Sequence, residues 1–83
     1  MPTRAEKTFA AVTSGLHDSN ISFSDLRHLL DSLDFSERIK GDHHIYSHAQ
    51  ILEIINIQPE RNKAKAYQVR QIREILQKYR MEV

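Results

Sequence analysis

The sequence contains no cysteine and no tryptophan, and it has only two glycines and two prolines among its 83 residues. Without cysteine the chain can have neither a disulfide framework nor a thiolate zinc site, and the absence is compatible with the cytosol. No apolar run approaches the roughly 20 residues that span a bilayer. Residues 1–7 lack the apolar stretch of a signal peptide. We therefore expect a cytoplasmic protein without a membrane partner.

What is present describes one small globular domain. Apolar residues make up 40% and charged residues 28% of the chain, which is usual for a folded soluble protein. A single domain over residues 1–83 is expected, with about 60–65% of the unfolded chain's surface buried on folding. There are no internal repeats and no low-complexity tracts.

Positive charge is concentrated toward the end of the chain, although the net charge is only +1. Between residues 61 and 80 the only acidic residue is Glu74, and the basic residues there are Arg61, Lys63, Lys65, Arg70, Arg73, Lys78 and Arg80. Such a segment indicates a local anionic partner, with nucleic acid as the first candidate. A solvated helix face is the alternative that charge alone leaves open.

Two helices are predicted in the first part of the chain. Residues 4–14 carry Phe9 and Val12 on one side and end near Gly15, which can adopt the left-handed conformation at a helix end. The segment 1–18 is therefore expected to be a helical N-terminal extension.

The second predicted helix covers residues 23–33. Ser22 is expected to cap its first backbone N–H groups, with the side chain of Asp25 facing back in a capping box. Apolar residues at helical spacing define its core face: Phe23, Leu26, Leu29, Leu30 and Leu33.

Three strands follow. Residues 35–40 and 43–48 are joined at Gly41-Asp42, a two-residue connection typical of a type II′ hairpin. Residues 51–58 contain four isoleucines and are predicted to be the third strand. Pro59 should end this strand, because proline has no N–H group for a sheet.

A basic loop is expected over residues 60–65 and a last helix over 66–80. The buried side of that helix is predicted to consist of Val69, Ile72, Ile75, Leu76 and Tyr79, while Arg70, Arg73 and Arg80 lie opposite. The fold class is therefore α+β, with a three-stranded antiparallel sheet that carries the helices on one face.

Adjacent histidines open the second strand. Alternation places His43 with Ile45 on one face, and His44 with Tyr46 and His48 on the other. A zinc site needs three or four converging ligands, and no cysteine or pair of carboxylates accompanies these histidines in the sequence. We therefore predict no metal and no cofactor, and a structural or surface role for all the histidines stays an alternative.

A catalytic role would fall on His43, which stands where the turn meets the strand. Imidazole can take and give protons near neutral pH. The neighbouring carboxylate of Asp42 could orient the ring, and Lys40 could hold a phosphate. RNA supplies its own nucleophile in the 2′-hydroxyl, so one acid/base group with nearby cations suffices in principle for slow cleavage.

Several runs together resemble the HicA family of bacterial toxins. They are Asn20-Ile21-Ser22-Phe23-Ser24-Asp25-Leu26, Leu29-Leu30, Glu37-Arg38-Ile39-Lys40-Gly41-Asp42-His43-His44-Ile45-Tyr46, Ile54-Ile55-Asn56-Ile57-Gln58-Pro59 and Asn62-Lys63-Ala64-Lys65-Ala66-Tyr67-Gln68-Val69-Arg70-Gln71. The resemblance covers roughly residues 18–80. The short motif Gly41-Asp42-His43 would be weak evidence alone. The resemblance is specific because the runs that begin at Ile54 and Asn62 follow this motif in the same order as in the family.

The resemblance implies a fold similar to double-stranded-RNA-binding domains, with the order α-β-β-β-α over a core of residues 21–80. It implies an mRNA interferase, an endoribonuclease that cleaves mRNA and is neutralised by a HicB-type antitoxin. The catalytic histidine of the family corresponds to His43, while His44 is expected to be structural. Contacts to RNA are expected, on charge rather than on a family motif, from the turn and the basic segment: Lys40, Gly41, Lys63, Lys65, Arg70 and Arg73.

The chain departs from the family pattern at three positions. Asp42 stands where serine is usual and puts a negative charge beside the supposed catalytic group. Asp34 replaces a glycine at a position that commonly adopts positive φ. Ala66 replaces a proline at the start of the last helix. Only the first departure touches function, and it leaves open a weakened or repurposed toxin.

Two alternatives to a ribonuclease toxin stay open. One is a non-catalytic RNA-binding module of the same fold. The other is a protein-interaction domain whose sheet edge or histidine face serves only a partner.

Overall fold

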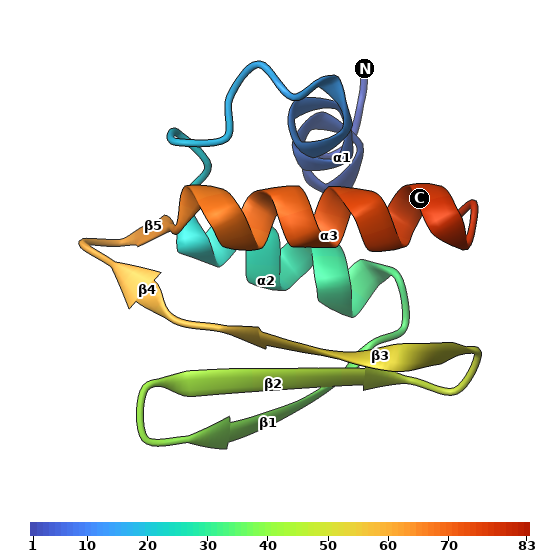
Figure 1. The fold of residues 1–83 in the computed structure, drawn as a ribbon. Helices are drawn as coiled ribbons and strands as arrows, with labels where there is room; N and C mark the ends of the chain where they lie inside the picture. The colour runs from blue at the N-terminus through green and yellow to red at the C-terminus, as the bar shows by residue number, and fades with distance from the viewer.

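A computed structural model describes all residues 1–83 and shows an α+β fold, as the sequence predicts (Figure 1). In chain order the elements are α1 (Arg4–Ser14), α2 (Phe23–Ser32), β1 (Ser36–Lys40), β2 (His43–His48), β3 (Ile51–Ile57), β4 (Pro59–Glu60), β5 (Lys63–Ala64) and α3 (Ala66–Lys78). No helix is long and apolar enough to cross a membrane.

The sheet has the order β1-β2-β3 and is antiparallel throughout. Helices α2 and α3 lie together on one face of it, and α1 packs on the far side of these two helices, so that the other face of the sheet is left uncovered (Figure 1). The core forms between the sheet and the helices from one cluster of 17 buried residues. All five apolar residues predicted for the core face of 23–33 are buried there.

Local sequence explains the helix ends. Gly15 ends α1 with φ +75°, as expected from its position. Ser22 caps α2 by accepting a hydrogen bond from the backbone N–H of Asp25. The predicted return contact of a capping box is absent, because the Asp25 carboxylate instead accepts from Arg4 Nε at 2.8 Å and so ties α1 to α2.

The β1–β2 turn has the predicted two-residue form, with Lys40 paired to His43. Gly41 adopts φ +63° and Asp42 has no positive φ, which is the pattern of a type II′ turn. The turn therefore fixes where β2 begins and places the His43 side chain at the end of the sheet.

The β2–β3 ladder contains an irregularity that the sequence does not reveal. His48 pairs with Ile51 across the connection, but beyond the irregularity Tyr46 pairs with Ile55 and His44 with Ile57. At this irregularity β3 contains two more residues than the facing part of β2, which shifts the pairing register by two. Because the shift is an even number, each side chain stays on the same face of the sheet. As a result Gln58, rather than Asn56, follows in line opposite His43.

The basic segment 60–65 differs from the predicted loop. Pro59–Glu60 and Lys63–Ala64 pair as the small hairpin β4–β5. Arg61 and Asn62 form its turn with φ +50° and +67°, a conformation with positive φ at both central positions. Backbone hydrogen bonds join this hairpin to the start of α2, so it is held in place rather than free.

Candidate functional site

His43 lies at the end of β2 on the uncovered face of the sheet. Its side chain is 47% exposed. The predicted alternation is confirmed, since Tyr46 and His44 face the helices while His43 does not. An imidazole in this position is reachable by a large substrate such as a nucleic acid strand.

The amide side chains of Asn56 in β3 and of Gln58, the residue after β3, contact the His43 ring. The Gln58 amide nitrogen lies 2.8 Å from Nε2 of His43 and 3.3 Å from Nδ1. Asn56 Oδ1 lies 3.2 Å from Nδ1. Asp42, which the sequence predicts as the orienting group, is 3.9 Å from Nε2 with its side chain 75% exposed. This separation is beyond hydrogen-bond length, so Asp42 does not orient the ring. Asn56 Oδ1 contacts Nδ1 alone, whereas the Gln58 amide nitrogen, within 3.3 Å of both ring nitrogens, lies over the face of the ring.

Cations approach His43 from two sides. Lys40 is its cross-strand partner on β1, and Arg38, two residues earlier, shares the face by alternation and is exposed. On the other side Lys65, the residue before α3, donates from Nζ to Gln58 Oε1 at 3.3 Å. The lysines that the sequence singles out at 40 and 65 therefore lie on either side of the histidine.

The small hairpin continues the positive surface. Lys63 donates from Nζ to Asn20 Oδ1 at 2.8 Å. An open hollow of about 390 Å³ next to it carries three basic side chains, and its lining consists of Ser19, Glu60, Arg61, Lys63, Ala64, Lys65 and Ala66. A phosphate group entering this hollow would meet cations near the end of the sheet that carries His43.

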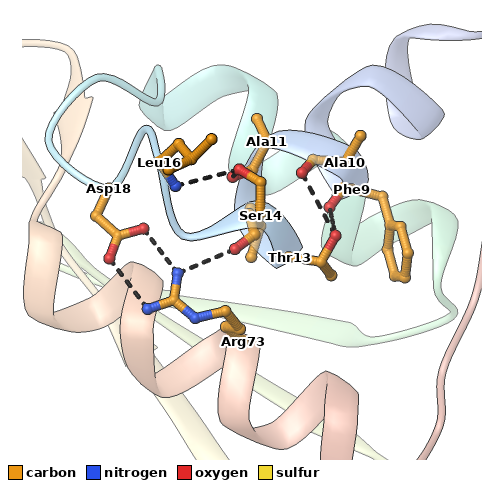
Figure 2. Close-up of polar contacts among 9 residues, drawn as sticks. Phe9, Ala10, Ala11, Thr13, Ser14, Leu16, Asp18 and Arg73 are labelled. Carbon is orange, nitrogen blue, oxygen red and sulfur yellow. Dashed lines mark hydrogen bonds and ion pairs between the residues drawn. The ribbon is translucent and has the colours of Figure 1, made fainter.

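Arg73 lies apart from this surface. Its guanidinium donates to both oxygens of the Asp18 carboxylate (Figure 2). It also donates to the carbonyl oxygen of Val12 in α1. The hydrogen bonds from Arg73 lower the pKa of Asp18, and the charge of Arg70 contributes to the same shift. Both arginines thus face the α1 side of α3, away from the sheet. The structure does not bring them together with His43, and the Arg73 side chain already has partners.

His44 lies on the face of the sheet that the helices cover and is part of a hydrogen-bond network there. Its ring packs edge-on against Phe23 with centroids 4.8 Å apart, and its Nδ1 lies 2.8 Å from Glu37 Oε2. Glu37 also accepts two hydrogen bonds from Arg27 and one from the hydroxyl of Tyr46. The hydrogen bonds from Arg27, ahead of those from Tyr46 and His44, lower the pKa of Glu37 to about 2. Burial, followed by the hydrogen bond to Glu37, raises the pKa of Tyr46.

This hydrogen-bond network has a structural role. Arg27 comes from α2, while Glu37 and Tyr46 are cross-strand partners on β1 and β2, so the contacts bind the helix to the first hairpin. The third histidine of the strand, His48, packs against Phe35 with ring centroids 5.0 Å apart. No group of three or more histidine or carboxylate side chains is arranged to hold a metal ion.

Sequence reasoning missed Gln58, Asn56 and Arg38. Strand alternation places Arg38 on the face of His43 and could have found it. Gln58 could not have been assigned, because its place beside His43 depends on the shifted β2–β3 register.

Comparison of the chain with models of known protein families, with curated proteins and with solved structures finds no match in any of the three.

Proposed function

We propose that the protein is a HicA-type toxin that cleaves mRNA, with His43 as the general acid/base of a metal-independent endoribonuclease. The observation that carries the proposal is the position of His43. It is half-exposed at the end of the sheet with Lys40 on one side and Lys65 on the other. The resemblance of the sequence runs to HicA toxins selects RNA among the anionic polymers that such a surface would accept.

The arrangement supplies the elements of a transesterification within RNA. His43 accepts the proton of a 2′-hydroxyl as the 2′-oxygen forms a bond to the adjacent phosphorus. The bond from phosphorus to the 5′-oxygen breaks, and the leaving oxygen takes a proton from the imidazolium or from water. Lys40 and Lys65 offset the charge that grows on the phosphoryl oxygens, which stabilises the transition state more than the ground state.

A toxin of this kind acts in the cytoplasm, where mRNA is found, and needs a neutralising partner. The uncovered face of the sheet offers a surface for a HicB-type antitoxin, because β3 carries exposed apolar side chains there, toward the end of the sheet away from His43. Leu52 is 91% and Ile54 56% exposed. Apolar groups this exposed on a strand favour a protein contact over a contact with RNA phosphates.

The test is RNA cleavage by the purified protein, with growth followed on induced expression in a bacterial host. We expect cleavage and growth arrest from the wild type, cleavage that persists in the presence of a metal chelator, and loss of both effects in His43→Ala. His17→Ala is the matched control, since it removes an exposed histidine outside the site. Equal cleavage and toxicity in wild type and His43→Ala would refute the proposal.

A non-catalytic RNA-binding module would give a different result. Binding would persist in His43→Ala and weaken in Lys40→Met and Lys65→Met, with a smaller salt dependence. No cleavage would be seen with any variant.

A further inference from the structure

A second hollow, of about 400 Å³, lies on the other side of the hairpin β4–β5 from the basic hollow. Its lining consists of Ser22, Phe23, Ser24, Arg27, His44, Pro59 and Asn62. Glu60 and Lys63, which line the basic hollow, are cross-strand partners and share one face of the hairpin. Pro59 faces the other way by alternation, so the hairpin separates the two hollows.

The two hollows differ in charge. The basic hollow has three cations against one carboxylate. In the second hollow the only permanent charge is that of Arg27, and it is balanced by two hydrogen bonds of 2.9 Å to the Glu37 carboxylate. The basic hollow therefore suits a phosphate. The second hollow, with carbon atoms of Phe23 and Pro59 in its walls, suits a flat neutral group.

Two polar groups of the second hollow have no hydrogen-bond partner within the protein. The carboxyl of Glu37, whose pKa the hydrogen bonds from Arg27 lower to about 2, is ionised and accepts from Nδ1 of His44. The other ring nitrogen, Nε2, makes no hydrogen bond and reaches solvent, so in the neutral ring it is a free acceptor. The exposed side-chain amide of Asn62 also has no partner, and it offers both a donor and an acceptor.

The hairpin between the hollows is held against the start of α2. The N–H of Phe23 donates to the carbonyl oxygen of Asn62 at 2.9 Å, and the N–H of Ala64 donates to that of Ile21 at 2.9 Å. Arg61 and Asn62 have φ +50° and +67°, a conformation that is uncommon without glycine and that is often found at binding sites. The turn thus presents Arg61 to the basic hollow and Asn62 to the second hollow.

The hairpin lies at the same end of the sheet as the β1–β2 turn and His43 (Figure 1). We propose that the hollow lined by Phe23, His44 and Asn62 binds one base of the RNA substrate, while the basic hollow holds a neighbouring phosphate. The inference rests on the proposed function and adds sequence specificity to it. The base that forms hydrogen bonds with Nε2 of His44 and with the Asn62 amide determines where the RNA is cut, because sequence-specific RNA recognition reads the edges of unstacked bases.

Mapping of cleavage sites in RNA of random sequence tests the inference. For the wild type we expect one base to be preferred about 3- to 10-fold at one position near the cut, which is the net worth of about one hydrogen bond. Asn62→Gly removes the amide, keeps the positive φ and should abolish the preference at that position alone. Asp34→Gly is the matched control, because Asp34 also has φ +67° and lies beyond the opposite end of α2.

His44→Asn tests the other polar group of the hollow. Asparagine places its amide nitrogen about where Nδ1 of histidine lies, so it retains a donor to Glu37 while it lacks Nε2. The preference should weaken at the same RNA position as in Asn62→Gly. Circular dichroism melting of each variant separates a change of specificity from unfolding.

A binding measurement on the wild-type protein separates the inference from the proposed function. In NMR titrations the four nucleoside 5′-monophosphates should shift the side-chain amide signals of Asn62 and the ring signals of His44. Ribose 5-phosphate, which has no base, should leave both sets of signals unchanged. This result, together with a failure of the protein to cleave any RNA, would refute the proposed function and still support a base-binding site.

Three results would overturn the inference. The first is RNA cleavage by the wild type without a base preference at any position. The second is a preference that stays the same in either Asn62→Gly or His44→Asn. The third is a titration in which the nucleotides shift the signals of Asn62 and His44 no more than ribose 5-phosphate does.

Discussion

The guanidinium of Arg73 and the carboxylate of Asp18 form a two-point ion pair, with N···O distances of 2.8 and 3.1 Å, that joins α3 to the connection after α1 (Figure 2). The side chains of both residues are mostly buried, at 18% and 15% exposure. The same guanidinium donates to the carbonyl oxygen of Val12. The contact therefore attaches the N-terminal helix to the rest of the domain.

Arg73→Gln should destabilise the fold and leave RNA binding unchanged. The variant removes the charge from a pair whose other member, Asp18, would remain mostly buried without its partner, and such losses cost stability. Arg70→Gln, one turn earlier and exposed, is the control. In urea denaturation we expect a clearly lower midpoint for Arg73→Gln only. A loss of RNA affinity in Arg73→Gln at full stability would contradict the structural role.

The carboxylate of Glu37 should make the stability depend on pH on the acid side. Its folded pKa of about 2 lies below the value of 4.5 for an unperturbed glutamate. A carboxyl with a depressed folded pKa stabilises the fold above its unfolded pKa, and this stabilisation is lost as the pH falls from about 4.5 toward 2.

Melting temperatures between pH 2 and pH 7 test this prediction. The wild type should lose stability steeply below pH 4.5, and Glu37→Gln should be less stable at neutral pH and show a shallower acid slope. Glu53→Gln removes a second carboxyl, whose pKa is lowered to about 2 by hydrogen bonds from Lys78 and Tyr79. Glu53 lies on β3, with β2 between it and Glu37 on β1, and the two carboxyls share no hydrogen-bond partner. The double variant should therefore show about the sum of both changes. An unchanged acid slope in Glu37→Gln would contradict the assignment.

Asp34→Gly should stabilise the protein. Asp34 has φ +67°, in the left-handed region that glycine adopts without steric cost. We expect a gain of about 0.5–1 kcal/mol, since relief of the backbone exceeds the added freedom of the unfolded chain.

The matched control for this change is Asp31→Gly. Asp31 is also exposed but lies within α2, where glycine is less favourable than aspartate by about a few tenths of a kcal/mol. The free energies of unfolding from urea titrations should therefore move in opposite directions. A loss of stability in both variants would show that the Asp34 side chain contributes more than its backbone costs.

The elements of this fold are readable from the sequence because hydrophobic spacing determines them. Leu26, Leu29 and Leu30 recur at helical intervals, and all three are fully buried. The β1–β2 turn is equally local, since Gly41 supplies the positive φ that its type requires. Most properties that depend on one element or one turn were therefore predicted correctly, although the capping-box contact of Asp25 and the loop over 60–65 were not.

Properties that depend on the meeting of distant segments were not predictable. A helical wheel places Arg73 opposite the buried side of α3, but it does not reveal that α1 packs there and supplies Val12 as a partner. Likewise, the pairing of His48 with Ile51 at the β2–β3 connection, if continued along the ladder, would put Asn56 opposite His43. Two extra residues in β3 shift the register, so that Gln58 lies opposite His43 instead. In both cases tertiary packing decided which side chains meet.

Asp42→Ser should strengthen RNA binding. The Asp42 carboxylate lies 3.9 Å from Nε2 of His43 and is 75% exposed, so it adds negative charge where a phosphate would approach while making no hydrogen bond to the ring. Removing an exposed charge of this kind is worth up to about 1 kcal/mol, which corresponds to an affinity gain of about two- to five-fold. Serine preserves the turn, because Gly41 and not Asp42 adopts the positive φ.

Binding is best measured with a short RNA in the His43→Ala background, in which cleavage does not interfere. Asp31→Ser changes the net charge by the same amount from the helical side of the molecule and serves as the control. A gain confined to Asp42→Ser that shrinks as salt is added shows that the charge acts locally on the RNA backbone. Equal gains in both variants would mean that only the overall charge matters. If affinity fell in Asp42→Ser, the carboxylate would be part of the RNA contact, and the surface beside His43 would have to bind bases or sugars rather than phosphates.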